Sequence, residues 1–243
     1  ELKSTQGGEP GYDINGHVNI PVSDNFAIRA VGFYAKDGGY IDNIASPSPH
    51  GFGAVPDNAP FVKDDFNDYE VKGARVSANW NMNDDWNALV TLMYQDSTST
   101  GSWSTNSALG DYETAVFNDD SQTDEWLSGA VTIKGDLGFA ELSNTFAYSD
   151  RKRQSQDDIT GYEAYHTAWG RASSAEYYDG AYNYLDVYDT GYNGGSYGRS
   201  RPTKRISNET RLTSTTDSRF DWMVGTFFEK IEDGWFDSAD TPN

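Results

Sequence analysis

The feature that most constrains the fold of this chain is an alternation of apolar and polar residues with a period of two. Because every second side chain of a β-strand points to the same face, this pattern predicts strands with one apolar face and one polar face. In residues 86–96 the apolar positions are Trp86, Ala88, Val90, Leu92 and Tyr94. The pattern predicts strands in these segments: 11–22, 26–37, 69–82, 86–96, 123–134, 139–150, 204–214 and 219–231. It is weakest in 204–214, where Ile206 and Leu212 anchor the apolar face.

The connections between these segments are alternately short and long along the chain. Tight turns are expected at residues 23–25, 83–85, 135–138 and 215–218, and long loops at 38–67, 97–122 and 151–203. A soluble β-sandwich has no reason to keep this order, and a loop of about 50 residues is unusual in one. Outer-membrane barrels combine short periplasmic turns with long extracellular loops. The sequence therefore predicts an all-β fold, namely an antiparallel transmembrane β-barrel.

Aromatic residues, which make up 14% of the chain, gather near both ends of the predicted strands. Beside the short turns lie Phe26, Trp80, Trp86, Phe220 and Trp222, and near the long loops lie Tyr34, Tyr94 and Tyr148. Their amphipathic rings suit the two membrane–water interfaces. The alternative is that they form the core of a soluble sandwich. The opposite faces argue against it, since Arg29, Arg75 and Asn79 would then need buried partners.

Charge and residue types exclude several classes of function. The net charge of −20 argues against a nucleic-acid partner, because phosphate backbones require clusters of Lys and Arg. The chain has no Cys, which excludes disulfides and thiolate chemistry. Its 3 His are not spaced as a zinc site, and no nucleophile elbow or phosphate-binding loop is present. We therefore predict no catalytic residues, no cofactor and no metal, with weak Ca²⁺ binding by acidic loops as a less favoured alternative.

A tyrosine-rich segment, residues 161–200, is the best candidate for ligand recognition. Tyr and Trp offer large, rigid contact areas with a polar tip. The predicted ligand-binding residues are Tyr162, Tyr165, His166, Trp169, Tyr184, Tyr188 and Tyr192. An equally favoured alternative is that these rings pack on one another and hold the loop in shape. We expect Arg171, Arg199 and Arg201 to pair with neighbouring carboxylates rather than with an anionic ligand.

Several segments also carry a resemblance to a known family. Residues 16–24 (GHVNIPVSD) and 26–29 (FAIR) look like an early barrel hairpin, and residues 38–43 (GGYIDN) look like the loop after it. Residues 208–214 (NETRLTS) look like a later strand, with 221–228 as its hairpin partner. In this order they resemble TonB-dependent outer-membrane receptors. The resemblance implies a barrel of 22 strands around a plug, of which residues 1–243 would form about eight or nine strands of the single barrel domain.

The resemblance also implies a function, namely active uptake of a scarce nutrient across the outer membrane of a Gram-negative bacterium. Long extracellular loops would bind the small-molecule ligand: a ferric siderophore, a cobalamin-like compound, an oligosaccharide or an aromatic compound. The TonB–ExbB–ExbD complex would then act on the plug, and outer-membrane lipid and lipopolysaccharide would surround the barrel. The plug and the C-terminal strands of the family are absent from these residues, so the chain would be an excerpt. No bond is made or broken, so we do not expect an enzyme.

Three alternatives remain open. A passive porin would lack a plug and would narrow its lumen with its own loops. A secreted all-β carbohydrate-binding module would use the aromatic residues as stacking platforms. An all-β glycosidase ranks last, because it needs two carboxylates about 5–10 Å apart on rigid strands, whereas the acidic doublets lie in loops and turns.

Overall fold

The computed structural model describes residues 1–46, 58–160, 195–215 and 219–240, which form an all-β fold. The long strands are β2 (Gly11–Ser23), β3 (Phe26–Asp37), β5 (Tyr69–Asn81), β6 (Trp86–Thr100), β8 (Ser121–Asp136), β9 (Ala140–Asp158), β10 (Ser196–Ser214) and β11 (Met223–Asp233). The short elements are β1 (Leu2–Lys3), β4 (Asp42–Asn43), the 3₁₀ helix η1 (Ala59–Phe61), β7 (Glu113–Thr114) and β12 (Phe236–Asp240). Within these ranges, no helix has the length and apolar character needed to cross a membrane.

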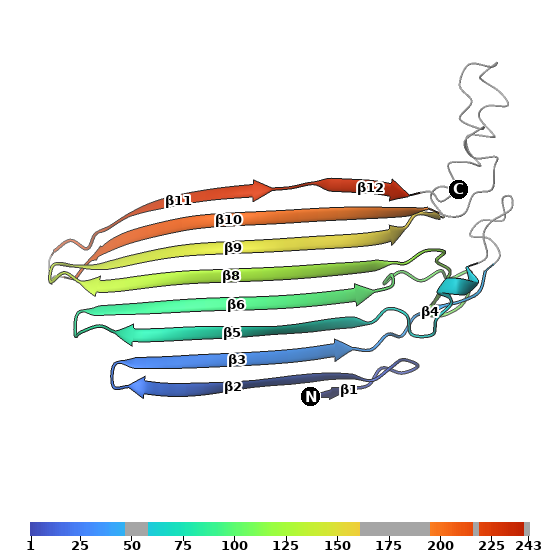
Figure 1. The fold of residues 1–243 in the computed structure, drawn as a ribbon, viewed down its shortest axis with the longest axis horizontal. Coiled ribbons are helices and arrows are strands. Elements are labelled where there is room, and N and C mark those ends of the chain that lie inside the picture. Colours follow the sequence, from blue (N-terminus) through green and yellow to red (C-terminus); the bar gives the residue numbers. More distant parts are fainter. Residues whose placement is uncertain (47–57, 161–194, 216–218, 241–243) are drawn as a thin grey trace, which may run out of the picture.

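The long strands form one antiparallel sheet in which neighbours along the chain are also neighbours in space (Figure 1). Among the described residues, the strand order is β1-β2-β3-β5-β6-β8-β9-β10-β11, and β12 also pairs with β10. Short turns lie at one end of the sheet and long connections at the other (Figure 1). The expected antiparallel all-β fold is confirmed. The sheet described is open, with β2 and β11 near its two edges.

One face of the sheet carries a broad apolar surface, which we call the belt and which only Asn144, Asn208 and Thr210 interrupt between β9 and β10. Residues directly opposite in register share a face, and one row of the belt contains Ile28, Ala78, Val90, Val131 and Phe146. The same row continues to Ile20 and Phe228. Adjacent rows add Val18, Ala30, Val76, Leu92, Leu127, Ile133, Leu142, Ile206, Leu212 and Val224. The described residues leave this face uncovered, and the Leu92 side chain is 57% exposed. The sheet therefore presents a large apolar surface on one side.

The opposite face, which we call the polar face, is hydrophilic and carries the arginines. Every arginine of the long strands lies on it by register: Arg29, Arg75, Arg151, Arg153, Arg199, Arg201, Arg205 and Arg211. On the belt side, by contrast, the apolar rows end in a charged row towards the long loops. This row contains Lys72, Asp96, Glu125 and Lys152. The predicted separation of one apolar and one polar face is confirmed.

Strands β9 and β10 are longer than the alternation predicts. β9 continues to Asp158 and β10 begins at Ser196, so both extend into the expected loop 151–203. The physical reason is that residues 151–158 are polar on both faces, which removes the apolar signal without preventing strand pairing. Cross-strand contacts such as the Arg199–Asp157 ion pair (2.6 Å) join the strand ends instead.

The last hairpin also differs from the expected strand at 219–231. β11 begins only at Met223, so Phe220 and Trp222 precede the strand. After β11 the chain pairs with β10 again as β12, and the Gly234 N–H donates to the Pro202 carbonyl (2.8 Å) between the two segments. Residues up to Asp240 therefore extend the edge of the sheet beyond the expected strand at 219–231.

Candidate functional site

Two long connections, between β3 and β5 and between β6 and β8, fold together at one end of the sheet. Their short strands β4 and β7 pair in parallel, and Asn43 forms a bridge with Lys63. The buried apolar side chains of the described residues are Ile41, Phe66, Phe117 and Ala140. Most of these belong to the two connections. The loops therefore have a small core of their own, whereas the sheet has almost none.

Buried asparagines strengthen the link that the short β4–β7 ladder makes between the two connections. The Asn43 side chain accepts a hydrogen bond from the Val116 N–H (2.8 Å) and donates to the Phe61 carbonyl (2.7 Å). Asn58 accepts from the Ser46 N–H (2.8 Å), and its amide donates to the Val116 carbonyl (3.2 Å). Asn43 and Asn58 are almost fully buried. Buried polar groups satisfied in this way fix one arrangement of the backbone, which gives the loops a defined shape.

Three rings from these loops meet at the surface, and we call Tyr40, Trp103 and Tyr112 the aromatic trio. The Tyr40 ring lies 6.2 Å from Trp103 and 5.9 Å from Tyr112 between centroids, edge-to-face in both cases. Asn67 anchors Tyr40 by accepting from its backbone N–H (2.8 Å), and the Trp103 indole N–H donates to the Ser99 hydroxyl (3.2 Å). Trp103 and Tyr112 are nevertheless 57% and 62% exposed. Exposed rings on a fixed backbone offer a stacking surface for a ligand.

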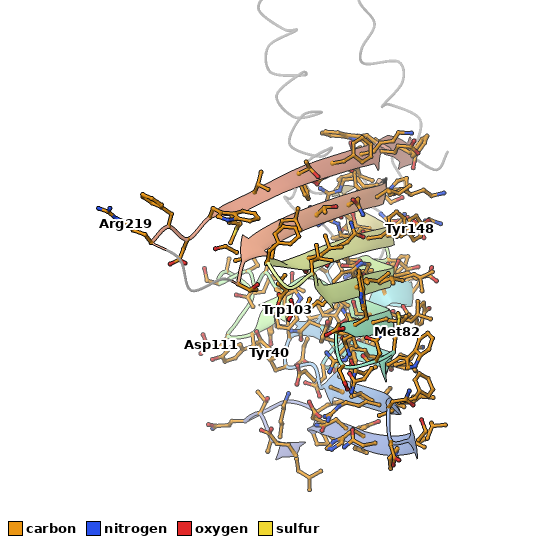
Figure 2. The ribbon with its side chains drawn as sticks, turned by 90° about the vertical axis from the view of Figure 1, so that its left-hand side faces the viewer. Tyr40, Met82, Trp103, Asp111, Tyr148 and Arg219 are labelled. Carbon is orange, nitrogen blue, oxygen red and sulfur yellow. The ribbon has the colours of Figure 1, made fainter. Side chains whose placement is uncertain are left out.

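The position of the trio relative to the sheet is visible in Figure 2. Tyr40 and Trp103 lie on one side of the sheet, and Met82 and Tyr148 lie on the other (Figure 2). By register, Tyr148 belongs to the belt side. The aromatic trio therefore lies on the side of the polar face, at the end where the long loops gather.

The surroundings of these loops are acidic. Burial and, to a smaller extent, the nearby carboxylates of Asp157 and Asp158 together raise the pKa of the Asp120 carboxyl to about 6. The pKa of Asp65 is also raised, because burial removes water from it and the Asp42 carboxylate lies nearby. Within the described residues, no group of three or more His, Cys, Asp or Glu could hold a metal ion. The local charge disfavours an anion beside the aromatic trio and favours a neutral or cationic ligand there.

The predicted ligand-binding residues lie outside the described part of the chain. They are Tyr162, Tyr165, His166, Trp169, Tyr184, Tyr188 and Tyr192, so their role stays a prediction. Arg171 lies in the same undescribed segment. Arg199 and Arg201 are described, and each pairs with a carboxylate, Asp157 and Asp237 respectively, at 2.6 Å. The expected pairing of these two arginines is confirmed.

Sequence reasoning did not single out the aromatic trio. Tyr40 lies in the GGYIDN segment, whereas Trp103 and Tyr112 lie in another loop, and no spacing rule links them. An indirect signal exists in Trp103, an aromatic residue inside a polar stretch of Ser and Thr, where no apolar neighbour explains it. The contacts that bring the rings together depend on the buried asparagines, which have no periodic signature.

Comparison with known proteins gives few matches. No protein-family model matches the chain. No curated protein sequence matches it either. Among solved structures, the siderophore receptor PiuA from Acinetobacter baumannii aligns with a TM-score of 0.36 and 10% sequence identity, over 95% of this chain and 40% of that receptor. The chain thus spans well under half the length of this neighbour, and the likeness assigns no family.

Proposed function

We propose that this chain is part of the wall of an outer-membrane β-barrel receptor, which captures a scarce nutrient with its long loops and imports it with energy from TonB. The observation that carries the proposal is the belt, an apolar surface on one face only of a sheet whose other face holds arginines and carboxylates. The TonB–ExbB–ExbD complex as partner rests on the family resemblance of the sequence. On this proposal the protein is a transporter and not an enzyme.

The dimensions of the belt support a membrane-facing wall. On β6 it runs from Trp86 to Tyr94, in line with the roughly 9–11 residues that a tilted barrel strand needs to cross a bilayer. Aromatic rings lie on the belt side at both ends: Phe26, Trp80 and Trp86 near the short turns, and Tyr34, Tyr94 and Tyr148 near the long loops. Two such girdles are typical of outer-membrane barrels. The charged row with Lys72 and Lys152, in which Tyr34 also lies by register, would lie at the level of lipopolysaccharide headgroups.

The polar face supports a water-filled or plugged interior. Its ion pairs join partly exposed side chains, for example Arg205 and Glu229 at 2.8 Å. Such ion pairs are favourable only in contact with water or polar partners. A soluble sandwich would instead have to cover the belt with a second sheet. The described residues contain only one large sheet, and it leaves the belt bare. A barrel places the belt against lipid and the polar face inside.

The aromatic trio supports capture of a ligand from outside. It lies at the long-loop end and on the polar-face side, which in a barrel is the mouth of the lumen. Transport would then carry the ligand past the polar face. The same arrangement fits a siderophore, a cobalamin-like compound, an oligosaccharide or an aromatic compound, because each presents a flat or ring-shaped surface for stacking.

Sidedness and energy coupling test this function together in intact cells. An epitope placed beside Ser104, in the long connection, should be detected on intact cells, whereas the same epitope at Asp84, in a short turn, should need a permeabilised outer membrane. Uptake is then measured with ⁵⁵Fe-loaded siderophores, ⁵⁷Co-cyanocobalamin and ¹⁴C-maltooligosaccharides. Uptake of one probe that needs both this protein and TonB supports the proposal. Uptake that persists without TonB would identify a passive porin, and a soluble protein would identify a secreted module.

A further inference from the structure

The polar face concentrates positive charge where β9 and β10 approach the long loops. Arg151 and Arg153 come from β9, and Arg199 and Arg201 from β10. Arg153 lies directly opposite Arg201 in the register of the two strands. Side chains opposed in this way have Cβ atoms about 4.5–5.5 Å apart, and like charges there are destabilising. The register therefore places two cations side by side, of which Arg201 lies over the Trp235 ring at 4.1 Å.

Carboxylates compensate three of these arginines but not the fourth. Asp124 binds Arg151 through both carboxylate oxygens, Asp157 binds Arg199, and Asp237 binds Arg201. Arg153 forms no hydrogen bond or ion pair with any residue that the structure describes. Asp124 lies directly opposite Arg153 in the register of β8 and β9, yet it pairs with Arg151 instead. The five N–H donors of the Arg153 guanidinium therefore remain available to another partner.

A pocket of about 200 Å³ opens beside Arg153. Its lining consists of Gln122, Arg153, Gln154, Ser155, Arg199 and Arg201, with no acidic residue among them. Guanidinium groups bind carboxylates through two parallel hydrogen bonds, and the neighbouring Arg151 already holds Asp124 in this way, with Nε donating to Oδ1 and Nη2 to Oδ2. An incoming carboxylate would meet Arg153 and would also offset its repulsion with Arg201.

We propose that this pocket binds a carboxylate group of a small organic acid, with Arg153 as its principal donor. The inference goes beyond the proposed function, because binding at this pocket does not require that the acid be the transported nutrient. On this proposal the long-loop end of the sheet carries two different surfaces: an aromatic surface in acidic surroundings at Tyr40, and a positively charged pocket at Arg153.

Isothermal titration of the full-length protein in detergent with succinate at low ionic strength tests the proposal. Wild type should bind succinate, and Arg153→Gln should weaken binding by at least about tenfold, since a charge-assisted pair is lost. The matched control is Lys152→Gln, an adjacent cation on the belt side that also has no ion pair among the described residues. It should bind succinate as wild type does. Arg153→Lys keeps the charge without the planar fork, so it should assemble normally and bind several-fold more weakly.

The unfolding temperature, measured with and without succinate, distinguishes an arginine that binds a ligand from one with a purely structural role. Without added anion, Arg153→Gln should unfold at the same or a higher temperature than wild type, because it removes the repulsion with Arg201. Succinate should raise the unfolding temperature of wild type but not of the variant. Succinate affinities within twofold of one another for wild type and Arg153→Gln would overturn the proposal. Binding of inorganic phosphate without binding of succinate would overturn the carboxylate assignment.

Discussion

The assignment of the belt to lipid makes Val90→Arg the most informative single substitution. Val90 lies on β6 midway between Trp86 and Tyr94, with Ala78 and Val131 opposite it on the neighbouring strands. At about 3.3 Å per residue it is about 13 Å along the strand from each ring, or about 10 Å along the membrane normal for a tilted strand. Val90 is thus near the midplane. A lipid-facing Arg at that depth should destabilise the barrel by about 2–4 kcal/mol.

The matched control is Leu89→Arg, the neighbouring residue on the polar face, opposite Asn79 and Thr132. It introduces the same charge without breaking a side-chain hydrogen bond, and its guanidinium stays in a polar environment. We expect it to change stability by less than about 1 kcal/mol. The assay is urea unfolding of the full-length protein in liposomes, followed by tryptophan fluorescence. Equal losses for both variants, or a larger loss for Leu89→Arg, would refute the assignment of the two faces.

Three further predictions concern the loops. Asn43→Ala should speed amide hydrogen exchange in residues 113–118 by about 5- to 150-fold, because the part-buried Val116 N–H loses its hydrogen-bond partner at a cost of about 1–3 kcal/mol; unchanged exchange would show that the asparagine does not hold the loops together. Trp103→Ala should weaken binding of the imported ligand by about thirtyfold, as expected for an exposed aromatic anchor, whereas Phe139→Ala at the opposite end of the sheet should leave the affinity unchanged. Asp120→Asn should raise the unfolding temperature at pH 7.5 but not at pH 4. The pKa of the Asp120 carboxyl in the folded state is raised to about 6, so the carboxyl is neutral at pH 4 and destabilises the fold when it is ionised at pH 7.5. An equal effect at both pH values would contradict this.

The strands could be predicted from the sequence because every second side chain faces the belt and is usually apolar, which produces an alternation with a period of two. On β5, β6 and β8 most belt residues alternate with polar ones, despite exceptions such as Leu89 and Met93, so the predicted and observed strand ends differ by only a few residues. The signal disappears where neither face meets an apolar environment. This is why β9 and β10 extend past Asp150 and before Lys204 without an alternation to show it.

The aromatic trio could not be predicted from the sequence. The sequence pointed instead to aromatic residues of the 161–200 segment, whose role stays a prediction, whereas the contacts that place the trio are between distant residues. Asn43 and Val116, for example, are 73 positions apart, and they meet through one side chain and one backbone. The like-charge pair of Arg153 and Arg201 depends on the register of two strands, which their polar ends do not reveal. Such contacts follow from three-dimensional packing and not from local pattern.

The central claim, that one face of this sheet lies against lipid, is tested most directly by a site-directed spin-label scan of residues 86–94. The chain has no Cys, so single cysteines can be introduced along β6 without removing native ones from it. In the full-length protein in a bilayer, labels at 88, 90 and 92 should be accessible to oxygen and protected from a water-soluble nickel complex. Labels at 87, 89, 91 and 93 should be less accessible to oxygen. Accessibility without a period of two, or with the two faces exchanged, would contradict the account.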